Sequence, residues 1–146
     1  MVAAVITLKL LADNFYHLFR GKATPRVRHM RTLTWGDSAT FQGTATGSKG
    51  MYTMDIALEK DPEGKVSFTS PVTYVKCSCP AFQYYVQDPL AKVGSTHPGT
   101  GHVNKKINNP AQIAAPCKHL YAYIQLIMQK GLINSANMRS ARVGRG

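Results

Sequence analysis

The residues with the clearest chemistry are three cysteines and one histidine, placed in two short pairs. Cys77 and Cys79 flank one serine in VKCSCPAF, and Cys117 and His119 flank one lysine in APCKHLYAYI. Three thiolates and one imidazole form a complete ligand set for a tetrahedral zinc ion, which favours sulfur and nitrogen donors. We therefore expect a structural zinc site at these four residues.

Two other interpretations of these residues stay open. His97 and His102 lie between the two pairs and could replace one ligand. The cysteines could also be buried thiols without a metal, next to a histidine at the surface. A secreted disulfide framework is not favoured, because three cysteines cannot all pair within one chain.

The same residues do not favour catalysis. A catalytic zinc site keeps an open coordination position, whereas four strong ligands close the shell. A zinc deaminase would need a second cysteine after Cys117 and a His-x-Glu element, yet no glutamate follows Glu63. A thiolate that binds zinc is also not free to attack a substrate. We expect a protein that is not an enzyme and has no catalytic residues.

A strand and a helix must bring the two pairs together. Residues 32–76 are rich in Thr, Gly and aromatic residues and in part alternate apolar with polar positions, which predicts an antiparallel meander. Pro80 favours a short helix directly after Cys79. Apolar residues recur at helical spacing after Cys117, which predicts a C-terminal helix that ends before Gly131.

The rest of the chain completes the predicted organisation. An apolar stripe at helical spacing predicts an N-terminal helix, with Val5, Leu8, Ala12, Phe15 and Phe19 on one face. We predict this helix and a basic arm at 1–31, a zinc-binding domain at 32–131 with a long loop at 88–116, and an Arg-rich tail at 132–146. The predicted fold class is α+β: an N-terminal helix, a small antiparallel β-meander and a C-terminal helix, joined by the zinc site.

The order C-x-C and then C-x-H, with each pair opening a helix after a β-meander, resembles the SWIM-type zinc finger. The segments CSCPAF and PCKHLYAYI carry this resemblance, which covers about residues 45–130. It implies a ββα module with a structural zinc. Members of that family serve in DNA binding and in protein–protein contact, and some are phage-encoded. The 37 residues between Cys79 and Cys117 exceed the usual spacer of the family.

Positive charge is concentrated in the second part of the chain. Residues 1–88 hold ten Lys or Arg and seven carboxylates, a net of 10 − 7 = +3, whereas residues 89–146 hold eight Lys or Arg and none, a net of +8. Such a region attracts polyanions or an acidic protein surface, although it could also be a solvated surface. The residues that we expect to contact nucleic acid or an acidic partner are Arg26, Arg28, Arg31, Lys105, Lys106, Arg139, Arg142 and Arg145.

These features predict a non-enzymatic, zinc-stabilised structural or adaptor subunit of a larger assembly, such as a phage virion or another nucleoprotein particle. Its loop and tails would contact other subunits, in a homo- or hetero-oligomer, or nucleic acid. The alternative is a free SWIM-type nucleic-acid-binding module. Residues 2–12 are apolar but too short to span a bilayer, so we expect neither secretion nor a membrane partner. The expected location is a virion or the cytoplasm of a prokaryotic host.

Overall fold

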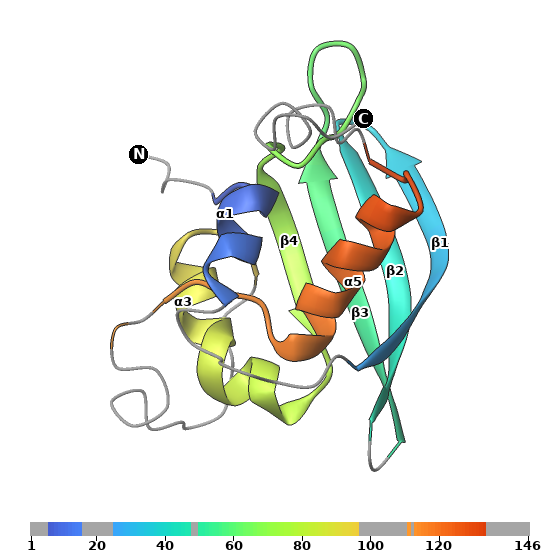
Figure 1. The fold of residues 1–146 in the computed structure, drawn as a ribbon. Helices are drawn as coiled ribbons and strands as arrows, with labels where there is room; N and C mark the ends of the chain where they lie inside the picture. Colours follow the sequence, from blue (N-terminus) through green and yellow to red (C-terminus); the bar gives the residue numbers. More distant parts are fainter. Residues whose placement is uncertain (1–5, 16–24, 48–49, 97–110, 112, 134–146) are drawn as a thin grey trace, which may run out of the picture.

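A four-stranded antiparallel sheet forms the centre of the protein. The computed structural model describes residues 6–15, 25–47, 50–96, 111 and 113–133. The strands lie side by side in chain order: β1 (Arg26–Trp35), β2 (Ser38–Gly47), β3 (Gly50–Glu59) and β4 (Val72–Cys77). The helices are α1 (Leu8–Asp13), the π-helical turn η1 (Phe82–Val86), α3 (Gln87–Lys92) and α5 (Lys118–Gln129) (Figure 1).

This architecture corrects the predicted fold class. The described residues form mostly a four-stranded sheet with short helices, and the strands occupy the middle of the chain, so the expected arrangement of helix, small meander and helix is wrong. The helix α1 has only six residues, whereas β1, β2 and β3 have ten each. Residues 26–31, expected in a basic arm, form the first part of β1, and residues 88–92 of the expected loop belong to α3.

The register of β2 and β3 decides which face of the sheet is buried. The two strands pair without interruption from Ser38 opposite Glu59 to Gly47 opposite Gly50. Phe41 and Ile56 face each other and are buried, whereas Thr40 and Gln42, which flank Phe41 on β2, are only half-buried. This alternation is typical of an antiparallel sheet that packs one face on a core.

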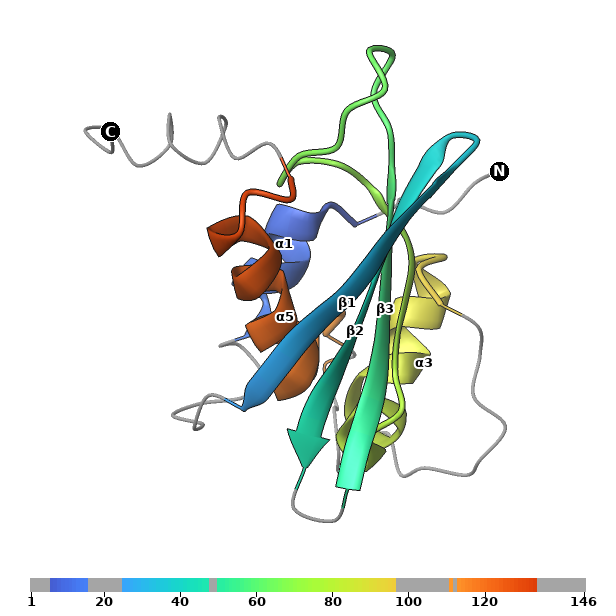
Figure 2. The ribbon, with the colours of Figure 1, turned by 90° about the vertical axis from the view of Figure 1, so that its right-hand side faces the viewer.

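The helices α1 and α5 cover the buried face and lie on the same side of the sheet (Figure 2). The buried residues of α5 recur at helical spacing, and they include Leu120, Tyr123, Ile124 and Ile127. Just after α5, Gly131 has φ 71° and the N–H of Leu132 donates to the carbonyl of Ile127, 2.9 Å away. This is the hydrogen bond of a helix end that glycine favours. None of the helices that the structure describes is long and apolar enough to cross a membrane.

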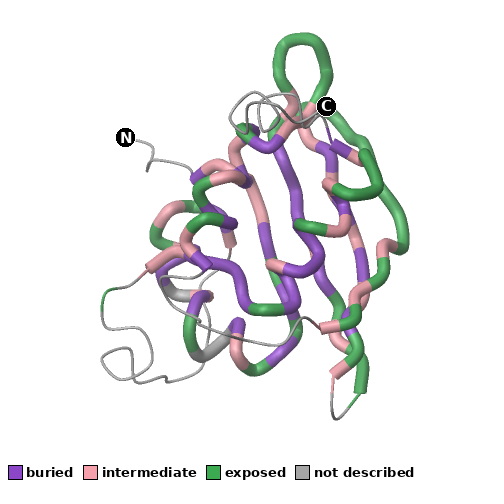
Figure 3. The backbone as a smooth tube through the Cα atoms, viewed as in Figure 1, coloured by how far each residue is buried: buried purple, intermediate pink, exposed green. Residues whose placement is uncertain are grey.

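The two edges of the sheet differ. Along β4, the N–H of Val75 donates to the carbonyl of Ser95 at 2.7 Å, and the N–H of Val72 donates to the carbonyl of Ile6 at 2.8 Å. At the opposite edge, β1 pairs only with β2 among the described segments, and most of its residues are exposed (Figure 3). The sheet therefore has one covered edge and one open edge.

Candidate metal centre

The two predicted ligand pairs meet in one buried cluster. One ligand atom each from Cys77, Cys79, Cys117 and His119 lies within 4.8 Å of all the others. The four residues are at most 4% exposed. The structure thus brings together the complete set of ligands that the sequence predicts, and the cluster is a candidate site for a metal ion.

The end of β4 and the turn after it position the first pair. Cys77 is the last residue of β4 and lies opposite Met54 of β3. Ser78 ties the turn to β3, since its N–H donates to the carbonyl of Thr53 at 3.0 Å and its Oγ accepts the N–H of Thr53 at 2.9 Å. Ser78 is exposed, whereas the cysteines on both sides of it are buried. The turn therefore directs both thiols inward.

The beginning of α5 positions the second pair. Cys117 is the N-cap residue of α5, and its carbonyl accepts the N–H of Tyr121 at 2.9 Å. Lys118 is exposed, so Cys117 and His119 occupy the buried side of the first turn. The side-chain amide of Asn14, just after α1, donates to the carbonyl of Ala114 at 2.9 Å and holds the segment that leads to Cys117.

One nitrogen of the His119 imidazole is buried without a hydrogen-bond partner among the described residues. This atom, Nδ1, is the one buried side-chain nitrogen or oxygen without a hydrogen-bond partner in the part of the chain that the structure describes. A buried polar atom in this state is destabilising by about 1–3 kcal/mol. A metal ion at the cluster would bind one of the two ring nitrogens of His119. The ring of Tyr52 lies against that of His119, with centroids 5.1 Å apart, and limits the room around the site.

The three thiols lie close enough together to shift one another's pKa values. Hydrogen bonds from Cys117 and then Cys77 hold the pKa of Cys79 far below its ordinary value, despite burial. Burial first, and then the other two cysteines, raise the pKa of Cys117 well above its ordinary value. The hydrogen bond from Cys117 lowers the pKa of Cys77, but donation to Cys79, burial and the nearby charge together raise it to about 12. The cluster alone therefore favours one thiolate, whereas a divalent cation could balance three.

The donor set limits the kind of metal. Thiolates and imidazole suit soft and borderline ions, whereas magnesium and calcium prefer oxygen. Among the described residues, the cluster contains no carboxylate. Four protein donors also complete a tetrahedral shell and leave no position for a substrate. The arrangement fits a structural ion better than a catalytic one.

The predicted contact residues divide into two groups. Arg26, Arg28 and Arg31 lie on β1 and are exposed. The other predicted residues lie outside the described part of the chain, and so do the alternative ligands: Lys105, Lys106, Arg139, Arg142, Arg145, His97 and His102. The arginines of β1 are therefore the predicted contacts that the structure places.

Sequence reasoning missed two features near these arginines. Aromatic residues such as Trp35 are more often core than surface, yet Trp35 is 85% exposed. Its position directly before the Gly36–Asp37 turn was the available signal. His29 of β1 also contacts Tyr123 of α5, with 2.7 Å between His29 Nδ1 and Tyr123 Oη. No local pattern in the sequence indicates that contact.

Comparisons with known proteins found no match of the chain to a protein-family model, to a curated protein or to a solved structure. The resemblance to the SWIM-type zinc finger therefore rests on the two ligand pairs and the residues beside them. What the structure adds is their spatial cluster, which is compatible with a zinc site.

Proposed function

We propose that the chain is a non-enzymatic structural or adaptor subunit whose fold is stabilised by zinc at Cys77, Cys79, Cys117 and His119. The observation that carries this proposal is the buried cluster of four ligand atoms within 4.8 Å of one another. Zinc is the ion that three thiolates and one imidazole favour, and a closed shell of four protein ligands is typical of structural zinc sites.

The zinc would fasten α5 to the sheet. Two ligands come from the end of β4 and its turn, and two come from the beginning of α5. Structural zinc binding supplies an apparent ~10–16 kcal/mol in zinc-finger peptides at neutral pH. That range is similar to the whole free energy of unfolding of a typical domain, about 5–15 kcal/mol. Zinc binding on this scale would therefore decide whether α5 stays fastened to the sheet.

The charge of the chain supports a role inside an assembly that contains nucleic acid. The net charge is +11, and no carboxylate follows Asp88. Such a chain is attracted to nucleic acid and to acidic protein surfaces. We propose a nucleoprotein particle, for instance a phage virion, in which other subunits and nucleic acid are its neighbours. A free SWIM-type nucleic-acid-binding module is the second candidate, and the exposed arginines of β1 favour it.

Metal content and unfolding test the zinc site. We expect one zinc per chain in elemental analysis of protein purified under reducing conditions. Cys117→Ser should lose the metal and the cooperative thermal transition. Lys118→Ala is the matched control, because this exposed side chain lies between two ligands, and it should keep both. A wild-type protein that unfolds cooperatively without any metal would contradict the proposal.

Sedimentation of the zinc-loaded protein separates the two candidate roles. An adaptor subunit should form a discrete oligomer, or bind its particle, at salt concentrations that remove nucleic acid. A free module should stay monomeric and bind nucleic acid with an affinity that falls steeply with salt. A monomer that binds neither a particle nor nucleic acid would contradict both.

A further inference from the structure

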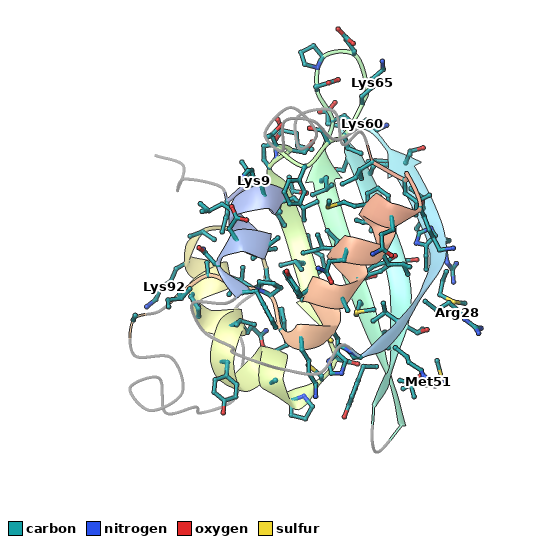
Figure 4. The ribbon with its side chains drawn as sticks, in the orientation of Figure 1. Lys9, Arg28, Met51, Lys60, Lys65 and Lys92 are labelled. Atoms are coloured by element: carbon teal, nitrogen blue, oxygen red, sulfur yellow. The ribbon has the colours of Figure 1, made fainter. Side chains whose placement is uncertain are left out.

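The face of β1 that points away from α1 and α5 carries three arginines, the exposed Leu33 and the tryptophan. Arg26, Arg28, Arg31 and Trp35 lie opposite polar residues of β2, namely Thr46, Thr44, Gln42 and Ser38. Phe41 and Ala45, on the other face of β2, are buried in the core. We call the three arginines, Leu33 and Trp35 of β1 the outer face. Figure 4 shows the side chain of Arg28 pointing away from α5.

A β-bulge gathers the arginines on one face. The register shifts between His29 and Arg31, so Met30 has no partner on β2. Side chains alternate between faces along a regular strand, which would place Arg31 on the face opposite to that of Arg28. The extra residue reverses the alternation, and Arg31 joins the outer face with Trp35. The bulge thus determines the composition of this surface.

The charge of the outer face is not neutralised within the described part of the chain. The ion pairs there join Lys9 to Asp13 and Lys65 to Glu63, and none involves an arginine of β1. On β3, the carboxylate of Asp55 accepts a hydrogen bond from Gln42 at 3.0 Å and lies opposite Lys76. The β2 residues beside the arginines are uncharged. The surface therefore fits an anionic partner.

A second copy of this chain is a poorer occupant of the open edge. Antiparallel pairing of two β1 strands would bring like charges close to each other across the strands, which is destabilising. The bulge at Met30 also interrupts the edge, and charges and bulges are the devices that keep edge strands from pairing. Both features favour an anion over another strand.

Trp35 favours nucleic acid over an acidic protein. An exposed indole beside arginines matches the combination by which proteins bind single strands, in which basic groups follow the phosphates and aromatic rings stack on bases. Arg26 and Arg28 are two residues apart on a strand, about 7 Å, and Arg31 follows after the bulge, so three positive charges lie along the strand for a repeating anionic backbone. A duplex keeps its bases stacked on one another and would leave the indole unused.

We infer that the outer face of β1 binds single-stranded nucleic acid, with Arg26, Arg28 and Arg31 on phosphates and Trp35 stacked on a base. The inference rests on the proposed function, since it names one partner of the proposed subunit. The hydroxyl and amide groups of β2 lie beside this path and can donate hydrogen bonds to phosphate oxygens.

Trp35 is the single tryptophan of the chain, so its fluorescence reports on this surface directly. The full-length, zinc-loaded protein is titrated with an oligo(dT) of about 16 nucleotides, the upper end of common site sizes. We expect saturable quenching. Changing all three arginines to alanine should reduce the slope of log affinity against log salt by about 2, at about 0.7 per phosphate of a single strand.

Anisotropy of a labelled oligo(dT) measures the variants that lack the indole. Trp35→Ala should weaken binding about 5- to 150-fold, the contribution of one stacked base, whereas Trp35→Phe should keep most of the affinity. The matched control replaces Lys65, Lys92 and Lys118 by alanine. It removes the same charge from exposed positions, and Figure 4 shows Lys65 and Lys92 well separated from Arg28. This control should weaken binding much less than the arginine variant.

Three outcomes would overturn the inference. Equal losses of affinity in the lysine control and the arginine variant would show a nonspecific electrostatic attraction rather than a binding site on β1. Quenching by poly-glutamate as strong as that by oligo(dT) would identify an acidic protein as the partner. Absence of quenching in a protein that holds zinc would reject the inference and leave the proposed function standing, whereas a wild-type protein without zinc would reject the proposed function itself.

Discussion

Gly43 shows how a single residue sets the contact between the sheet and α5. It lies on β2 between His29 of β1 and Met54 of β3. A Cβ at this position would lie 2.7 Å from Cζ of Tyr123 and 2.5 Å from the carbonyl oxygen of Arg28. Both separations are far below a van der Waals contact, so the absence of a side chain lets the tyrosine ring approach the β2 backbone.

Gly43→Ala should therefore lower the free energy of unfolding by about 1–3 kcal/mol, the usual effect of overpacking. The obstacle includes the backbone of Arg28, which cannot rotate away as a side chain can. Thr44→Ala is the control, since Thr44 is half-buried on the opposite face. Its effect should be smaller. Urea unfolding of both zinc-loaded variants measures the difference, and equal midpoints would contradict this placement of Tyr123.

The residue scale is also where the sequence was most informative. Cys77, Cys79, Cys117 and His119 stand out because few other residue types bind zinc and because each pair flanks one residue. Gly43 carries no such signal, since the ring that occupies its space belongs to a helix much later in the chain. Chemistry can be predicted from residue types, whereas a contact of this kind requires the fold.

Among the elements, β1 and α5 are joined by a histidine. His29 Nδ1 lies 2.7 Å from Tyr123 Oη, and His29 Nε2 lies 3.1 Å from Thr32 Oγ1. Burial and then the charge of Lys130 lower the pKa of His29 from its ordinary 6.5. Burial and then the charge of Asp55 raise the pKa of Tyr123, which keeps its proton. The contact therefore joins two neutral side chains at neutral pH.

This contact should make stability depend on pH. Because the pKa of His29 is lower in the folded protein, the unfolded chain takes up a proton first, near its ordinary value of 6.5. The free energy of unfolding should thus fall as the pH drops below about 6.5 toward the folded value. His29→Gln should give a flatter profile in that window, measured by urea unfolding at constant zinc. The four residues of the metal cluster are the same in both proteins, so parallel profiles would contradict a role for His29.

The predicted fold class was wrong because the sequence patterns behind it were local, whereas the helices and strands also depend on partners elsewhere in the chain. The apolar stripe from Val5 to Phe19 predicts a long helix, and both of these end residues lie outside the described residues. Within the described residues, α1 begins after Thr7, whose Oγ accepts the N–H of Leu10, and ends at Asp13. Arg26, Arg28 and Pro25 suggested an arm, yet pairing with β2 makes these arginines part of a strand. Strand formation depends on such distant partners more than helix formation does.

At the scale of the whole molecule, the ligand cluster joins parts of the chain that are far apart. The turn after β4 and the beginning of α5 are separated by 37 residues between Cys79 and Cys117. The types of the ligands predicted this meeting, but not the covered edge at β4 or the open edge at β1. The covered edge depends on the hydrogen bond of β4 with Ser95, and the open edge on the position of β1 at the end of the sheet, beside β2 alone among the described strands.

Removal of the metal should release α5 before the central strands. β2 and β3 are joined by a continuous register over their full length, whereas Cys117 and His119 would lose the ion that holds the first turn of α5. The three thiols and the His119 imidazole would then stay buried without the ion, which favours opening. Hydrogen exchange before and after chelation should accelerate most in Lys118–Gln129 and least in β2 and β3, and zinc should restore protection. If α5 keeps its protection in protein shown to be free of metal, packing alone holds the helix on the sheet. That result would contradict a role of the metal in holding α5.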